Sequence, residues 1–171
     1  MTDLQALFGH IDIYLFDQLL RGRAPAGARM CDAGCGSGRN LAFVLREGYD
    51  VRAVDAEPAA IDLVRSTAER LAPDLPADNF RLEPVEEMSF RDRSVDFVIS
   101  SAVLHFARDD DHFEAILREC WRVLERNGIF FCRLLRASST RVGAKNQASR
   151  CAAPLVRSRA MQIHPTGGRA A

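Results

Sequence analysis

The stretch Asp32-Ala33-Gly34-Cys35-Gly36-Ser37-Gly38 (DAGCGSG) decides how the rest of this sequence is interpreted. It follows a short apolar run, residues 29–33, and precedes a segment with helical spacing, residues 39–47. Three alternating glycines let the backbone turn tightly and approach a ligand where a Cβ would collide. A plain turn between a strand and a helix needs fewer glycines, so the pattern favours a ligand-binding loop.

Short apolar runs alternate with amphipathic segments on both sides of this loop. This alternation predicts βαβ units and therefore an α/β fold with a doubly wound, mostly parallel sheet of about five strands and helices on both faces. Ligands of such sheets bind outside the carboxyl ends of the strands, where the strand order reverses, so the glycine loop is expected in the binding crevice. The predicted helices cover residues 3–20, 39–47 and 58–71 and run from Asp109 to a stop at Asn127-Gly128, and the predicted strands cover residues 29–33, 51–54, 80–83, 95–100 and 129–135.

Two common nucleotide-binding patterns do not fit the loop. A dinucleotide loop reads G-x-G-x-x-G, and the third glycine position is here Arg39. A P-loop needs Gly-Lys-Ser/Thr, which does not follow. The carboxylate of Asp32 at the end of the predicted strand would repel a pyrophosphate and suits a ligand with a cationic end. A nicotinamide-dependent oxidoreductase is therefore a disfavoured alternative.

With these features the sequence resembles the class I S-adenosylmethionine-dependent methyltransferases. The resemblance spans about residues 10–136 and is carried by four blocks: DAGCGSG, VDAEP with Asp55 after the second strand, VDFVISSAVLHF (residues 95–106) and RECWRVLERNGIFF (residues 118–131). From Phe80 onward it is most similar to the small-molecule or tellurite-resistance-like branch. The resemblance implies a Rossmann-like fold, S-adenosylmethionine as cofactor and methyl transfer to a small-molecule acceptor. A non-catalytic or degenerate cofactor-binding domain is the alternative.

The resemblance also implies which residues bind the cofactor. Asp32 is expected to favour the ammonium end, and Asp55 to accept hydrogen bonds from the two ribose hydroxyls. The family's acid near the adenine is replaced by Pro84, so the N–H of Val85 and the side chain of Glu86 are the expected adenine contacts. The full set of expected cofactor-binding residues is Asp32, Gly34, Cys35, Gly36, Gly38, Asp55, Val85 and Ser101.

The catalytic residue stays unknown at this level, with His105 as the candidate base because an unperturbed histidine titrates near neutral pH. A structural histidine packed beside Phe106 is the favoured interpretation. Methyl transfer depends mainly on positioning, so the lack of an evident catalytic pair does not argue against activity. Arg21 and Arg23 could reach the methionine carboxylate, but surface charge is the favoured interpretation of both.

We expect no metal site. The acidic run Asp109-Asp110-Asp111 suits the start of a helix, where negative charge complements the helix dipole. The five cysteines lack the paired spacing of zinc ligands and fit a reducing, cytoplasmic setting. No apolar run approaches the ~20 residues of a membrane span, and the start of the chain lacks the pattern of a signal peptide.

The charge is distributed unevenly along the 171 residues. The chain has 23 acidic and 23 basic residues, but residues 137–171 contain no acid, while Lys145 and five arginines lie there. This shift predicts a folded body over residues 1–136 and a poorly ordered basic tail over residues 137–171. The resemblance implies that the body is an S-adenosylmethionine-binding domain, and the body has no basic patch for nucleic acid.

The C-terminal antiparallel strand pair of the family is not recognisable after Leu135. Residues 129–135 would then form an exposed edge, which predicts possible self-association. The tail is interpreted as an out-of-frame continuation, with a basic tail for an acidic partner, or strands that pair with another chain, as alternatives.

Overall fold

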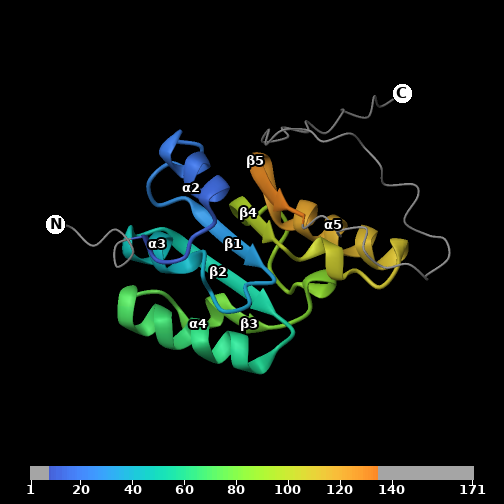
Figure 1. The fold of residues 1–171 in the computed structure, drawn as a ribbon, viewed down its shortest axis with the longest axis horizontal. Helices are drawn as coiled ribbons and strands as arrows, with labels where there is room; N and C mark the ends of the chain where they lie inside the picture. The colour runs from blue at the N-terminus through green and yellow to red at the C-terminus, as the bar shows by residue number, and fades with distance from the viewer. Residues whose placement is uncertain (1–7, 135–171) are drawn as a thin grey trace, which may run out of the picture.

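A computed structural model describes residues 8–134 of the chain. Within these residues, five parallel strands form one sheet in the order β3-β2-β1-β4-β5 (Figure 1). The strands are β1 (Arg29–Ala33), β2 (Asp50–Asp55), β3 (Phe80–Leu82), β4 (Val95–Ser101) and β5 (Leu124–Arg133). The α-helices are α2 (Ile13–Leu20), α3 (Leu41–Arg46), α4 (Pro58–Leu71) and α5 (Asp110–Val123), and short 3-10 turns are η1 (Ala77–Asn79), η2 (Val85–Glu87) and η3 (Leu104–Phe106). The predicted fold class is confirmed.

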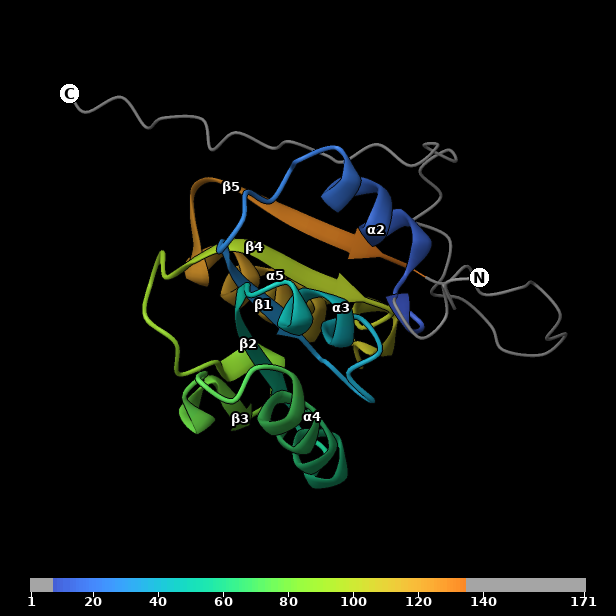
Figure 2. The ribbon, with the colours of Figure 1, turned by 90° about the vertical axis from the view of Figure 1, so that its left-hand side faces the viewer.

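Helices cover both faces of the sheet. The cluster under α2, α3 and α4 contains Leu15, Val44 and Val64, and the cluster under α5 contains Ile116 and Cys120 (Figure 2). Strand β1 contributes alternately to the two clusters because successive side chains of a strand point to opposite faces. A strand that is buried on both faces reads as a continuous apolar run, as residues 29–33 nearly do.

The glycine loop leaves the sheet where the strand order reverses. Strand β1 pairs with β2 on one side and with β4 on the other, so the loop that follows β1 lies where the two halves of the sheet meet. The backbone N–H groups of Gly34 and Cys35 both donate to the carbonyl of Val54, at 2.9 and 3.0 Å. The loop is therefore fastened to the end of β2, in the position where doubly wound sheets bind ligands.

The predicted continuous helix over residues 3–20 is wrong at residues 9–12, where the structure has a break, while residues 13–20 are helical as predicted. Gly9 has a φ of +64°, a left-handed conformation that ends a helix, and His10 lies in the same turn. Helix α2 begins anew at Ile13, with Asp12 as its N-cap accepting the N–H of Tyr14 at 3.0 Å. The apolar spacing continues through the break, so periodicity alone does not reveal that a new helix begins there with Asp12 as its N-cap.

The predicted stop of the last helix at Asn127-Gly128 is also wrong. Helix α5 ends at Val123 and Leu124 already pairs with β4. Asn127 has a φ of +64° inside a bulge of β5, where the register shifts. A Cβ on Gly128 would lie 2.9 Å from the carbonyl oxygen of Asp96, so glycine permits close approach of the two strands rather than ending a helix.

Other boundaries differ by a few residues. Helix α3 begins at Leu41 rather than Arg39, and β4 includes Ser101. Strand β5 is an edge strand of the described sheet and ends at Arg133. The predicted tail over residues 137–171 lies outside the described residues. Within the described range, no helix combines the length and apolar character needed to span a membrane.

Candidate functional site

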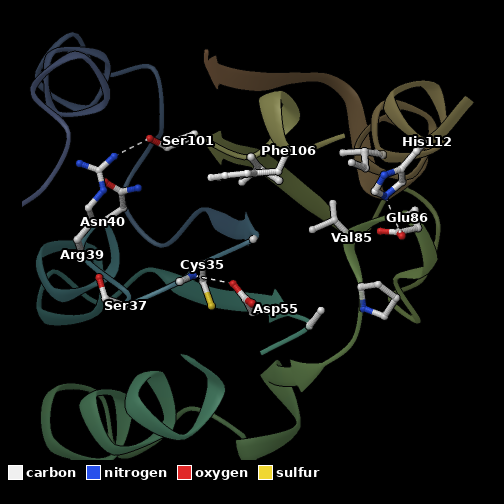
Figure 3. A pocket seen from close by; sticks show the side chains of 17 residues that line it. Cys35, Ser37, Arg39, Asn40, Asp55, Val85, Glu86, Ser101, Phe106 and His112 are labelled. Carbon is white, nitrogen blue, oxygen red and sulfur yellow. Dashed lines mark hydrogen bonds and ion pairs between the residues drawn. The ribbon is translucent and has the colours of Figure 1, made fainter. Parts of the chain in front are cut away.

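A cavity of about 480 Å³ opens at the carboxyl ends of the strands. Its lining comes from the glycine loop and the start of α3, the end of β2, turn η2, and the segment that leads from β4 into α5 (Figure 3). The volume falls in the range of small-molecule sites. The cavity therefore lies at the place that the sheet topology predicts for a ligand.

Most of the residues predicted to bind the cofactor line this cavity. Gly34, Cys35, Gly36, Asp55, Val85 and Ser101 are among the lining residues. Asp32 and Gly38 are not, although they flank the loop that supplies the wall. The structure thus brings six of the predicted residues, from four separate segments, to the cavity wall. The other two, Asp32 and Gly38, are buried behind that wall.

The carboxylate of Asp55 is held by two backbone groups. Its Oδ2 accepts the N–H of Gly36 at 2.8 Å, and its Oδ1 accepts the N–H of Glu57 at 3.0 Å. Each carboxylate oxygen can accept more than one hydrogen bond, so both oxygens keep capacity for a ligand hydroxyl. The two bonds fix the orientation of an acid that faces the cavity (Figure 3).

Two glycines of the loop serve different purposes. Gly36 has a φ of +50°, and a Cβ placed there would meet no atom of residues 8–134 within 4 Å, so this backbone has open space beside it in that part of the chain. A Cβ on Gly38 would lie 2.8 Å from Cγ2 of Val64 in α4. Gly38 therefore lets α4 pack closely against the loop, while Gly36 leaves room for a ligand beside the backbone.

Asp32 is a buried acid with an unused oxygen. Its side chain is 1% exposed, and its Oδ2 has no hydrogen-bond partner among the described residues. Burial raises the pKa of this carboxyl to about 8, the charge of Asp55 adds to the rise, and that of Arg39 opposes it. A buried acid without a partner gains by pairing with a cation, which is the ligand chemistry expected from the sequence.

An acid and a histidine line the cavity on the side away from Arg39 (Figure 3). Glu86 from η2 and His112 from α5 both line it, with Oε1 and Nε2 2.8 Å apart (Figure 3). The other ring nitrogen, Nδ1, accepts the backbone N–H of Arg108 at 3.1 Å, which leaves the proton of a neutral ring on Nε2. Nε2 makes no hydrogen bond among the described residues, so it is near the carboxylate of Glu86 without being aligned to donate to it. The sequence indicated Glu86 but not its histidine partner, because the two residues come from different elements.

Arg39 and Asn40 also line the cavity. In the sequence, Arg39 is notable only as a mismatch to a dinucleotide loop, and Asn40 was not predicted as a site residue. The Nη2 of Arg39 donates to Oγ of Ser101 at 2.9 Å and lies 3.5 Å from Oδ2 of Asp12. Asn40 accepts the N–H of Asp12 through Oδ1 at 3.0 Å. The sequence signal was present: an acid interrupts an apolar run at Asp12.

Asp12 is a fully buried carboxylate that also contacts Arg133 at the end of β5. Burial opposes its ionisation, but the hydrogen bonds from Arg133 and from the N–H of Tyr14, with the charges of both arginines, outweigh that effect and hold its pKa below the ordinary value. Asp12 is therefore an anion that joins α2, the start of α3 and two strand ends.

The remaining candidates lie away from the cavity lining. The ring of His105 packs against Phe106, with centroids 4.2 Å apart, and only Phe106 lines the cavity. Arg21 pairs with Asp17 on the surface, and Arg23 is exposed. Asp109 caps α5 by accepting the N–H of His112 at 2.8 Å, as the acidic run predicts.

The site fits S-adenosylmethionine in three respects. The unpartnered oxygen of Asp32 suits an ammonium group near the loop. The open space at Gly36 suits close backbone approach. The fixed carboxylate of Asp55 suits a pair of hydroxyls. These features come from the chain itself and match the charged, sugar-bearing parts of that cofactor.

Comparisons with known proteins agree with this chemistry. A family model described as a methyltransferase domain matches residues 31–132. The malonyl-[acyl-carrier protein] O-methyltransferase of Serratia marcescens is 30% identical over 69% of this chain and 42% of its own length. The chain thus spans less than half the length of this curated relative.

Solved structures show the same fold. An S-adenosylmethionine-dependent methyltransferase from Methanosarcina mazei has a TM-score of 0.57 and 28% identity, over 67% of this chain and 55% of its own. A TehB-like S-adenosylmethionine-dependent methyltransferase from Corynebacterium glutamicum has a TM-score of 0.57 and 26% identity, over 75% of this chain and 65% of its own. Membership of the tellurite-resistance-like branch stays a prediction. The chain belongs to the methyltransferase-domain family, whose cofactor is S-adenosylmethionine.

Proposed function

We propose that this chain transfers a methyl group from S-adenosylmethionine to a small-molecule acceptor. The observation that carries the proposal is the Asp55 carboxylate, fixed by the N–H groups of Gly36 and Glu57 beside an open glycine loop. A ligand with neighbouring hydroxyls and a positively charged end satisfies both this carboxylate and the buried Asp32. The similarity to an O-methyltransferase of Serratia marcescens supports the same reaction class.

The proposed roles of the residues come from the resemblance to the family, and the cavity lining supports them for Asp55, Val85 and Ser101. Asp55 accepts the ribose hydroxyls, the N–H of Val85 and the side chain of Glu86 meet the adenine, and Asp32 balances the ammonium. The backbone of residues 34–36 lies along the methionine and ribose. Ser101 forms part of the wall on the β4 side.

Held by Asp55 and the glycine loop, S-adenosylmethionine would supply a methyl group activated by its sulfonium, with the neutral thioether as the leaving group. The chain contributes position and a shaped, partly apolar cavity. Val103, Phe106 and Ile116 belong to the apolar part of the lining. A cavity of about 480 Å³ with this mixed lining suits small molecules.

A second candidate function is cofactor binding without methyl transfer. The position of His105 favours it, because the candidate base does not line the cavity. Acceptors that need no base, such as thiols, would still react under the first proposal. The two functions therefore differ in turnover and not in cofactor binding.

Calorimetric titration of the full chain with S-adenosylhomocysteine and, separately, with NAD tests the proposal. We expect binding of S-adenosylhomocysteine at micromolar concentration and no binding of NAD. Binding of NAD alone would overturn the assignment. A panel of thiol, hydroxyl, carboxyl and amine acceptors with radiolabelled S-adenosylmethionine then separates the two functions: label transfer supports catalysis, and binding without transfer to any acceptor supports the second candidate.

A further inference from the structure

The cluster of Asp12, Arg39 and Arg133 contains more positive than negative charge. The carboxylate of Asp12 has no exposed surface, while the side chains of Arg39 and Arg133 are each 37% exposed. Two guanidinium groups share this single carboxylate. Since a guanidinium stays charged throughout the physiological range, the cluster has one positive charge that Asp12 does not neutralise.

Among the residues that the structure describes, no other acid near Arg39 removes this excess. Asp32 is the further carboxyl whose charge interacts with Arg39. Burial raises its pKa to about 8, so it is mostly protonated near pH 7, and an ammonium group bound there would neutralise its ionised form. Arg39 has five N–H donors, and its described contacts are Ser101 and Asp12. Arg39 therefore keeps N–H donors and positive charge with which it can bind an anionic ligand.

The excess charge lies on the half of the sheet edge opposite the proposed ribose and adenine contacts, where Ser101 is the predicted cofactor contact. Asp55 ends β2 and Val85 follows β3, so the ribose and adenine roles occupy the β2–β3 half. Ser101 ends β4 and Arg133 ends β5, on the opposite half. Figure 3 shows Arg39 joined to Ser101 along one side of the cavity, away from Glu86 and His112.

An apolar surface accompanies the charge on this half. Phe106 lines the cavity and yet is 74% exposed. Val103 lines the same wall, between the end of β4 and Phe106. An exposed aromatic ring at a cavity mouth offers a packing surface to a ligand, because covering it removes apolar area from water.

We propose that the acceptor is a small organic acid, recognised through its carboxylate by Arg39 and, behind it, Arg133, with an apolar or aromatic body against Phe106. The inference rests on the proposed function, since it assigns the β4–β5 half of the cavity to the acceptor. Asp12 acts as a positioning residue: it holds both guanidinium groups and is itself out of reach of solvent.

Titration of the full chain, saturated with S-adenosylhomocysteine, with pairs of acids and their neutral amides tests the inference. Benzoate with benzamide, 4-hydroxybenzoate with 4-hydroxybenzamide, and hexanoate with hexanamide are the probes. We expect at least one acid to bind tenfold or more tightly than its amide, with a preference that declines as salt is raised. Equal binding of acid and amide in every pair, or no binding of any probe, overturns the inference. Failure of S-adenosylhomocysteine itself to bind is a separate result, which overturns the proposed function.

Two arginine variants locate the charge. Arg39→Gln is expected to abolish the preference for acid over amide, whereas Arg91→Gln, at an exposed arginine outside the cavity lining, is the matched control and is expected to keep it. An equal loss of the preference for acid over amide in both variants would show an effect of overall charge, and the inference would then be wrong. If Arg39→Gln instead weakens S-adenosylhomocysteine tenfold and leaves 5′-methylthioadenosine, which lacks the amino-acid end, unaffected, then Arg39 binds the cofactor carboxylate and the inference is wrong. Because the acid and amide comparison uses the unaltered chain, it stands even where a variant does not fold.

Discussion

Oδ2 of Asp55 accepts the backbone N–H of Gly36 at 2.8 Å, which joins the end of β2 to the middle of the glycine loop. The two residues are not neighbours in the sequence, since 19 positions separate them. The bond aligns a carboxylate and a bare stretch of backbone on the same wall of the cavity. Cofactor binding and loop geometry are therefore expected to depend on the same side chain.

Asp55→Asn is expected to weaken the binding of S-adenosylhomocysteine by about 1–3 kcal/mol, because a hydrogen bond to a charged group is lost. The amide keeps the shape but loses the charge and one of the two accepting oxygens. Calorimetric dissociation constants measure the effect. Asp62→Asn, at an exposed acid on α4, is the control and should leave the affinity unchanged. An unaltered dissociation constant in Asp55→Asn would remove the ribose role.

Gly36→Ala separates backbone strain from loss of ligand space. Gly36 and Gly27 both have positive φ values, +50° and +74°, and a Cβ meets no atom within 4 Å at either position. Alanine at either site should cost about 1–2 kcal/mol of unfolding free energy, because both impose the left-handed conformation. Only Gly36→Ala should weaken S-adenosylhomocysteine, by tenfold or more. Equal affinity in the two variants would show that the cofactor does not lie against Gly36.

Asp32→Asn is expected to change how stability depends on pH. Burial raises the pKa of Asp32 to about 8, whereas an unfolded aspartate titrates near ~4. Between these values the folded state keeps a proton that the unfolded state has lost, so the stability of the parent protein falls as the pH rises through this window. Each unit of the difference is worth about 1.4 kcal/mol, and the total is on the order of a few kcal/mol.

The measurement is the unfolding free energy of the parent and of Asp32→Asn at pH 5 and pH 8, by denaturant titration. The variant cannot ionise at this position, so its stability relative to the parent should increase from pH 5 to pH 8. Asp62→Asn, at an exposed acid, serves as the reference and should follow the parent. Parallel pH profiles for the parent and Asp32→Asn would contradict a protonated, buried Asp32.

Asp12→Asn tests the ion pairs apart from the helix cap. Asparagine is also a good N-cap, so the bond from the N–H of Tyr14 can persist while Arg39 and Arg133 lose their carboxylate. We expect a loss of about 1–3 kcal/mol in the free energy of unfolding at pH 7. Asp109→Asn removes the charge of an exposed N-cap and should cost less than about 0.5 kcal/mol.

The pH dependence of this loss has a defined sign. The pKa of Asp12 is depressed in the folded state, so its contribution is fully present above ~4 and disappears as the pH falls through the folded value. The stability difference between the parent and Asp12→Asn should therefore shrink in acid. A difference that is constant down to pH 3 would show that the variant acts through packing and not through charge.

Much of the fold was predictable because it rests on local patterns. The apolar runs of β1 and β4, the helix from Pro58 and the cap at Asp109 all follow from spacing and residue type. Periodicity failed where a single backbone conformation overrode it. Gly9 breaks a regular apolar stripe, and the Asn127-Gly128 pair lies in a strand bulge, although the same pair often ends a helix.

By itself, the sequence determined the glycine loop, the alternation of strands and helices, and the acids at the ends of β1 and β2, because each depends on residues close together in the chain. Tertiary structure alone decided which partners meet around the cavity. Asp12 and Arg133 are 121 positions apart, and Glu86 and His112 come from different elements, so their contacts arise only when the sheet and helices pack. Burial of Asp32 likewise follows from packing on both sides of β1, and it is this burial that makes an ordinary carboxyl favour its protonated form.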